Sequence, residues 1–203
     1  MKNKILFPIR LLFCSTESKF GLKSIREERM EYVNKFCFGK VLDIGCGPNN
    51  LFIKDYVGDK NGVGVDVFEY EGVKHIIKDT SKFPFKDNSF DTITLIAVGG
   101  HIPKEQRLAE FKEIARMLAP KGRLIMTEGE PISQWLYHKY LHFRYGDEDM
   151  DSQRGGQDEE LCMPKKEIMQ YFNTNGLGYE MKTRFMWGLI PVYFARKSWN
   201  ETN

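Results

Sequence analysis

Residues 41–50 have the sequence VLDIGCGPNN, in which a short apolar run ends in an acid and two glycines one residue apart. A strand that leads directly into a glycine turn is typical of nucleotide sites in parallel α/β sheets. Such turns usually hold a phosphate, which a carboxylate at Asp43 would repel. The dinucleotide pattern G-x-G-x-x-G also needs a third glycine, where this chain has Asn50. The stretch therefore predicts a ligand that carries a positive charge, and it argues against a nicotinamide-dependent dehydrogenase.

Apolar runs alternate with amphipathic segments on both sides of this turn. Further strands are expected in GVGVDVF, VKHIIKD, FDTITLIAV and RLIMTE, with helices in LFIKDYV and KEQRLAEFKEIARML. The longer helix has an apolar stripe made of Leu108, Phe111, Ile114, Ala115 and Leu118. This alternation predicts a doubly wound, mostly parallel Rossmann-like α/β sheet with helices on both faces. A last helix in PKKEIMQYFNTNG and a C-terminal antiparallel hairpin in residues 179–197 bring the sheet to about seven strands.

The chain of 203 residues suits a single domain. Four parts are expected within it: an N-terminal helical arm at 1–40, a cofactor-binding core at 41–130, a lid or insertion at 131–160, and the last helix with the terminal hairpin at 161–203. The first residues, MKNKILFPIRLLFC, are partly typical of an export signal, but Pro8 and Arg10 interrupt the apolar run. A docking arm or a short amphipathic segment is therefore favoured, and no apolar stretch approaches the ~20 residues that span a bilayer.

The charge is nearly balanced, with 30 Lys and Arg against 28 Asp and Glu. Such a balance gives no reason to expect a nucleic-acid partner. The four cysteines lack zinc-like spacing, which indicates reduced thiols and a cytoplasmic location. The sequence leaves the oligomeric state open.

Two further acids end predicted strands. Asp66 follows the glycine turn by about 20 residues, the offset of an acid that binds ribose hydroxyls. Asp79 ends the third strand, where it or Thr80 would meet an adenine amino group. S-adenosylmethionine fits this set of acids, because it is a nucleoside with a sulfonium and an ammonium group and has no phosphate.

The segments VLDIGCG, GVGVD, IIKDTSKFPFKDNSFD and GGHIPKEQRLAEFKEIARMLAPKGRLIMTE occur in this order within residues 41–128. With them the sequence resembles the class I S-adenosylmethionine-dependent methyltransferases that act on small molecules. The resemblance implies S-adenosylmethionine as cofactor, S-adenosylhomocysteine as product and no metal. The cofactor-binding residues that it implies are Asp43, Gly45, Cys46, Gly47, Asp66, Val67, Asp79, Thr80 and Ala97.

Two features depart from the family pattern. Asn49 stands at the third glycine of D-x-G-x-G-x-G, a change that many relatives tolerate. The segment between Asp66 and Asp79 is short, so the second helix of the fold is expected to be reduced to a loop. Neither departure argues against the cofactor.

The methyl acceptor is expected near AVGGH, residues 97–101, which follow the fourth strand. His101 is a candidate general base, although a histidine that only orders the loop is favoured. Trp135, Tyr137, His138 and Tyr140 are candidate substrate residues in a lid; the alternative is a helix that buries its aromatic side chains. No zinc site is expected at His138, because the H-E-x-x-H glutamate and a third ligand are lacking.

Two functions from different classes are consistent with these patterns. The first is direct methyl transfer to an oxygen or nitrogen nucleophile of a small-molecule acceptor. The alternative is a non-catalytic protein that binds S-adenosylmethionine or acts as a scaffold. An acidic segment at 146–160 is expected to be a solvated loop, and a nucleic-acid acceptor such as tRNA is disfavoured by the charge.

Overall fold

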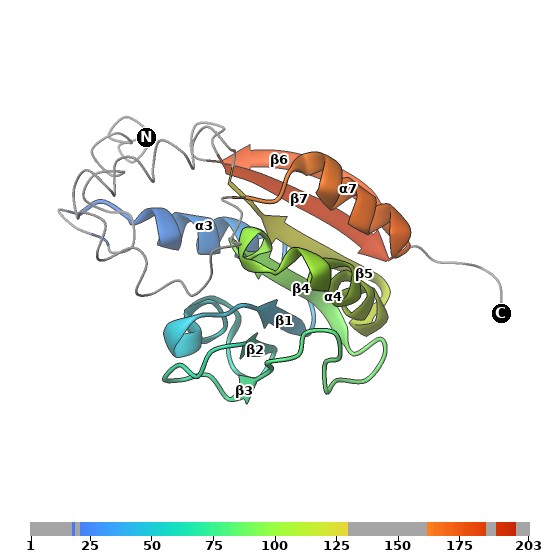
Figure 1. Ribbon diagram of the computed structural model, residues 1–203. Coiled ribbons are helices and arrows are strands. Elements are labelled where there is room, and N and C mark those ends of the chain that lie inside the picture. Colours follow the sequence, from blue (N-terminus) through green and yellow to red (C-terminus); the bar gives the residue numbers. More distant parts are fainter. Residues whose placement is uncertain (1–17, 19–20, 130–161, 186–189, 198–203) are drawn as a thin grey trace, which may run out of the picture.

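Seven strands form one sheet in the order β3-β2-β1-β4-β5-β7-β6, with β3 and β6 at its two edges (Figure 1). The computed structural model describes residues 18, 21–129, 162–185 and 190–197. β1 to β5 pair in parallel, whereas β7 is antiparallel to both β5 and β6. This confirms the predicted parallel sheet with a C-terminal antiparallel hairpin. The strands are β1 Val41–Ile44, β2 Gly62–Asp66, β3 His75–Ile76, β4 Phe90–Ile96, β5 Leu118–Thr127, β6 Leu177–Phe185 and β7 Ile190–Lys197.

Within the described residues, three α-helices accompany the sheet: α3 Ile25–Asn34, α4 Lys104–Met117 and α7 Lys165–Thr174. The Ser24 side chain starts α3 by accepting a hydrogen bond from the Glu27 amide, as N-cap residues do. Single turns of other helix types are η1 Pro48–Asn50, η2 Ile53–Val57 and η3 Gly99–His101. Residues 67–78, all of them described, contain no helix, as expected from the short spacing between the two acids.

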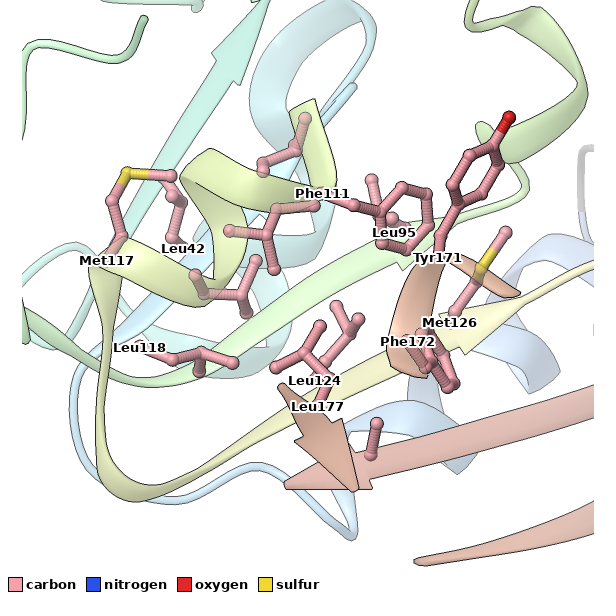
Figure 2. Close-up of a cluster of buried hydrophobic side chains, with 14 of the residues drawn as sticks. Leu42, Leu95, Phe111, Met117, Leu118, Leu124, Met126, Tyr171, Phe172 and Leu177 are labelled. Carbon is pink, nitrogen blue, oxygen red and sulfur yellow. The ribbon is translucent and has the colours of Figure 1, made fainter. Parts of the chain in front are cut away.

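The core has two parts, one on each face of the sheet. On one face α4 and α7 cover the strands, and Figure 2 shows Phe111, Tyr171 and Phe172 of these helices beside Leu95 and Met126 of β4 and β5. On the other face α3 and η2 pack through a second cluster, which includes Val33, Phe52, Ile53, Ile125 and Phe194. The strands are buried from both sides because helices cover both faces, and β1 is accordingly buried at every residue.

Two expectations about local structure are wrong. The predicted apolar stripe of α4 includes Leu108, but its side chain is 49% exposed, while the charged Arg107 and Glu110 are buried. The predicted third strand VKHIIKD is reduced to the two residues of β3, which lie exposed at the edge of the sheet. Both errors arise from tertiary contacts that the apolar pattern of one segment does not contain.

Candidate active site

The carboxyl ends of the parallel strands meet at one edge of the sheet. β1 and β4 are in register with Ile44 opposite Leu95, and β4 and β5 with Ile96 opposite Thr127. The loops that follow these strands therefore lie side by side. In open α/β sheets this edge is where ligands bind.

The glycine turn after β1 depends on backbone conformations that favour glycine. Gly45 and Gly47 have φ angles of 72° and 65°. A Cβ atom on Gly45 would lie 2.5 Å from a methyl group of Val98, so this position must lack a side chain for the loop after β4 to pack. A Cβ atom on Gly47 would meet nothing within 4 Å, so the backbone there borders open space into which a ligand fits. Asn49, at the position of the third family glycine, has φ 63°, which asparagine tolerates better than other side chains.

Asp66 is fixed at the end of β2 by backbone donors. One carboxylate oxygen accepts a hydrogen bond from the Gly47 amide at 2.8 Å, and the other accepts one from the Phe68 amide at 3.0 Å. The side chain is 8% exposed, and the neighbouring Val67 is exposed. A carboxylate accepts about four hydrogen bonds, so it keeps capacity for two ribose hydroxyls.

Asp43 lies inside the sheet beneath the turn. It is 2% exposed, and the Thr94 hydroxyl donates a 2.6 Å hydrogen bond to it. Burial raises the pKa of Asp43 to about 7, with a smaller contribution from the Asp66 charge, although the Thr94 hydrogen bond opposes the rise. In this position Asp43 braces the strand end beneath the turn through Thr94. The ionised form is costly here unless a cation lies nearby.

Cys46 is the residue between the two glycines. Its amide donates to the Val65 carbonyl at 3.0 Å, so the backbone of the turn is tied to β2. Burial raises the pKa of its thiol to about 12. Cys46 is therefore a neutral, apolar part of the turn at neutral pH and not a nucleophile.

In the loop after β3, one of the two candidate residues for the adenine contact, Asp79, faces solvent, and the other, Thr80, faces the interior. Asp79 is exposed, and its carboxylate accepts hydrogen bonds from the Ser81 amide and hydroxyl, which lower its pKa. Thr80 is buried. Beside it lies the buried Glu110 carboxyl of α4, whose pKa burial raises to about 7 against the effect of Thr80.

The loop after β4 is braced by β5. Ala97 adopts φ 59°, and its amide lies 3.1 Å from the Thr127 carbonyl and 3.0 Å from the Thr127 hydroxyl. His101 ends η3 with an exposed side chain. The structure thus brings together the turn, Asp66 and the loop at 97–101. The candidate substrate residues Trp135, Tyr137, His138 and Tyr140 lie outside the described residues.

The segment that contains this edge of the sheet matches a known protein family. Residues 42–126 match the family model described as "Methyltransferase domain". The match starts in β1 and ends in β5, so it contains the turn, Asp66 and the loop after β4. This segment is therefore similar to the methyltransferase domain family, and a solved S-adenosylmethionine-dependent methyltransferase of Methanosarcina mazei shares the fold of the chain.

The relatives of this chain carry names that point to different methyl acceptors. A Mus musculus protein named probable tRNA methyltransferase 9B is 36% identical over 92 residues, which are 42% of this chain and 21% of that protein. The chain thus spans about a fifth of the length of that relative. Demethylmenaquinone methyltransferase of Bacillus pumilus is 24% identical over 86% of each chain. A Thermotoga maritima methyltransferase structure, titled a possible histamine N-methyltransferase, shares the fold with a TM-score of 0.61 at 16% identity, over 97% of this chain and 95% of that chain.

Among the described residues, three buried charged side chains were given no role from the sequence: Arg107, Glu110 and Glu128. Glu128 had a detectable signal, because it ends the predicted strand RLIMTE, as Asp66 ends an earlier predicted strand at the same edge. Arg107 and Glu110 had none, since charged residues within a helix normally face solvent. Within the described part of the chain, no group of three or more His, Cys, Asp or Glu residues is placed to hold a metal ion, and no helix is long and apolar enough to cross a membrane.

Proposed function

We propose that this chain transfers the methyl group of S-adenosylmethionine to an oxygen or nitrogen nucleophile of a small-molecule acceptor. The observation that carries the proposal is the Asp66 carboxylate, held by the Gly47 amide beside open space at the glycine turn. This arrangement leaves carboxylate oxygens for a ribose next to backbone that a ligand can approach. The buried Asp43 adds negative charge, which suits a cationic cofactor and disfavours a phosphate.

The chemistry is a direct displacement at the methyl carbon. A lone pair of the acceptor forms the new bond to carbon, while the carbon–sulfur bond breaks and its electron pair stays on sulfur. The sulfonium is already activated, so the protein contributes mainly by holding the nucleophile and the methyl group in line. The edge of the sheet at 97–101 is the proposed place for the acceptor, since it adjoins the glycine turn through Val98.

A small-molecule acceptor is supported by the demethylmenaquinone methyltransferase of Bacillus pumilus, which matches over 86% of both chains. A tRNA acceptor is the second candidate, favoured by the higher identity to probable tRNA methyltransferase 9B over a shorter segment. The near balance of charge in this chain gives little attraction for a polyanion, so the small molecule is preferred.

Methyl transfer from labelled S-adenosylmethionine tests the proposal. The protein would be incubated separately with a small-metabolite extract, with reduced demethylmenaquinone and with bulk tRNA. Label in the first two fractions supports a small-molecule acceptor, and label only in tRNA moves the assignment to the second candidate. Cofactor binding without transfer in any fraction would favour the non-catalytic alternative.

Cofactor binding gives a prediction of its own. The purified chain should bind S-adenosylmethionine and S-adenosylhomocysteine with dissociation constants in the micromolar range, about −8 kcal/mol. Isothermal titration calorimetry measures both affinities. Absence of heat and of any thermal shift with either ligand would refute the cofactor assignment.

Substitution of Asp66 tests the ribose contact. Asp66→Ala should weaken binding of either ligand by about 1.5–3 kcal/mol, because two hydroxyls lose a charged acceptor. It also removes the acceptor of the Gly47 amide, so the turn itself loosens. Asp66→Asn keeps one oxygen and should lose less affinity. Equal affinity of Asp66→Ala and the unmodified chain in the same titration would show that the ribose lies elsewhere.

A further inference from the structure

Glu128 is the residue directly after β5, at the same edge of the sheet as the glycine turn. Its amide donates to the Pro191 carbonyl at 3.2 Å, which ties its backbone to β7. Its carboxylate is turned toward the loop after β4: a Cβ atom on Gly99 would lie 2.2 Å from Glu128 Oε2. The carboxylate therefore occupies the space that a side chain at Gly99 would need.

The two carboxylate oxygens of Glu128 have different surroundings. Oε1 accepts a hydrogen bond from the Gly129 amide at 3.1 Å. Oε2 is buried and has no hydrogen-bond partner within the part of the chain that the structure describes. The residue as a whole is 4% exposed. A buried oxygen without a donor is costly, and such an atom at a binding edge is explained by a ligand that donates to it.

Contacts connect Glu128 to the proposed cofactor site. Gly47 borders the open space, and Gly45, two residues earlier, packs against Val98. Gly99, which follows Val98 in the chain, packs against Glu128 Oε2. The loop after β4 therefore contacts the glycine turn on one side and this carboxylate on the other.

The charged groups around Glu128 come from two helices. Burial raises its pKa to about 7, while the Gly129 amide, Arg29 of α3, the Met163 amide and Arg107 of α4 oppose the rise. The Met163 amide lies near the carboxylate but outside hydrogen-bond geometry with Oε2. His101, at the exposed end of η3, is the titratable residue of the adjoining loop. A carboxyl group with this pKa exchanges a proton readily at neutral pH.

We propose that Glu128 is the proton acceptor for the methyl acceptor, which it binds through an O–H or N–H group at Oε2. The assignment rests on the proposed function. As the nucleophile's lone pair bonds to the methyl carbon and the carbon–sulfur electron pair moves to sulfur, the nucleophile's proton passes to Oε2. The products are the methylated acceptor, neutral S-adenosylhomocysteine and a protonated Glu128, which then loses its proton to water. The acceptor class is thus a neutral molecule with a proton on the atom that is methylated.

Glu128→Gln tests the assignment with little change in shape. Glu110→Gln is the matched control, since Glu110 is also buried, also has an oxygen without a described partner, and lies on α4. In the labelled-methyl assay with the small-metabolite extract, Glu128→Gln should lower kcat about 100-fold to 10,000-fold, as loss of a general base does. The rise in rate with pH through about 7 should disappear in this variant. Glu110→Gln should keep the rate, and a Glu128→Gln rate equal to it would overturn the assignment.

A second measurement needs no acceptor. Near the sulfonium, Glu128 should lose its proton when cationic S-adenosylmethionine binds and keep it when neutral S-adenosylhomocysteine binds. Calorimetry at pH 7 in buffers of different ionisation enthalpy counts this proton, and the difference between the two ligands should approach roughly half a proton. Glu128→Gln should lose the part of this difference that Glu128 contributes and keep the part that comes from Asp43, and Glu110→Gln should retain the whole difference. Equal differences in all three proteins would overturn the inference while leaving the proposed function intact; no binding of either ligand would overturn both.

Discussion

Arg107→Ala should destabilise the protein by about 3–5 kcal/mol, the range for loss of one partner of a buried ion pair. Arg107 is 1% exposed on α4. Its Nε donates to the Ile102 carbonyl at 2.8 Å, and its Nη1 lies 2.9 Å from Glu167 Oε1 on α7. The same Glu167 oxygen accepts a hydrogen bond from the Tyr171 hydroxyl at 2.7 Å. Without the guanidinium, a partly buried carboxylate loses its cation and the Ile102 carbonyl loses a donor.

Urea unfolding of the full chain measures the change. Lys112→Ala, an exposed substitution on the same helix, is the control and should change the free energy of unfolding by less than about 0.5 kcal/mol. Arg107→Met fills the space of the side-chain stem without the charge, so it separates the lost packing from the lost ion pair. A loss below about 1 kcal/mol in Arg107→Ala would mean that the pair contributes little to folding.

The hydrogen bond between Arg107 and the Ile102 carbonyl also connects the stability of the fold to the proposed acceptor site. Ile102 ends the loop at 97–102, which carries Gly99 against Glu128. Arg107 therefore anchors the loop by its hydrogen bond to the Ile102 carbonyl. Loss of this bond should also make the proposed acceptor position more mobile. We expect Arg107→Ala to reduce methyl transfer per folded molecule more than cofactor affinity, because the glycine turn and Asp66 lie on β1 and β2, away from this contact.

The sequence was sufficient for the elements whose patterns are local. The buried runs at 41–44 and 90–96 and the helix at 104–117 follow from apolar spacing and end signals alone. The glycine turn and Asp66 were located by motif, because a turn of this kind needs particular backbone conformations at fixed positions. Their ligand contacts, like the role of His101, stay predictions.

Other features depend on which segments meet in space. Arg107 is buried because α7 brings Glu167 to it, 60 residues later in the chain. Thr80 is buried next to Glu110 of α4. The Glu128 carboxylate fits where it does because Gly99 has no side chain. No periodicity within one segment contains such information, so the burial of Arg107 and Glu110 could not be predicted from the pattern, whereas Glu128 could have been noticed by its position at the end of a predicted strand.

The free energy of unfolding of the cofactor-free protein should fall as the pH rises from 5 to 8. Burial is the first cause of a raised pKa at Asp43, Glu110 and Glu128, each of which titrates at about 7 in the folded state. Their ordinary values are 3.8 for Asp43 and 4.5 for the two glutamates. Between these limits the folded chain binds more protons than the unfolded chain, so lower pH favours folding in this window. The loss from pH 5 to 8 should reach several kcal/mol in total, at about 1.4 kcal/mol per pKa unit for each group.

Below this window the sign reverses. The carboxyls of Glu113 and Glu180 have lowered pKa values: hydrogen bonds from Arg116 lower that of Glu113, and those from Arg196 and Arg123 lower that of Glu180 against burial. Their contribution is present above the ordinary carboxyl range and is lost as the pH falls through their folded values. Maximum stability of the cofactor-free protein is therefore expected near pH 5, below the usual neutral optimum.

Urea unfolding at pH 5, 6, 7 and 8 measures this profile, and Glu110→Gln supplies its internal control. Removal of one of the three titrating groups should flatten the profile by about a third. Saturating S-adenosylmethionine should flatten it as well, because a sulfonium and an ammonium near Asp43 and Glu128 favour their ionised forms. S-adenosylhomocysteine, which lacks the sulfonium charge, should flatten it less. A cofactor-free protein that is more stable at pH 8 than at pH 5 would show that these three carboxyls are already ionised at pH 5 in the folded state. Their burial would then not raise their pKa values as expected.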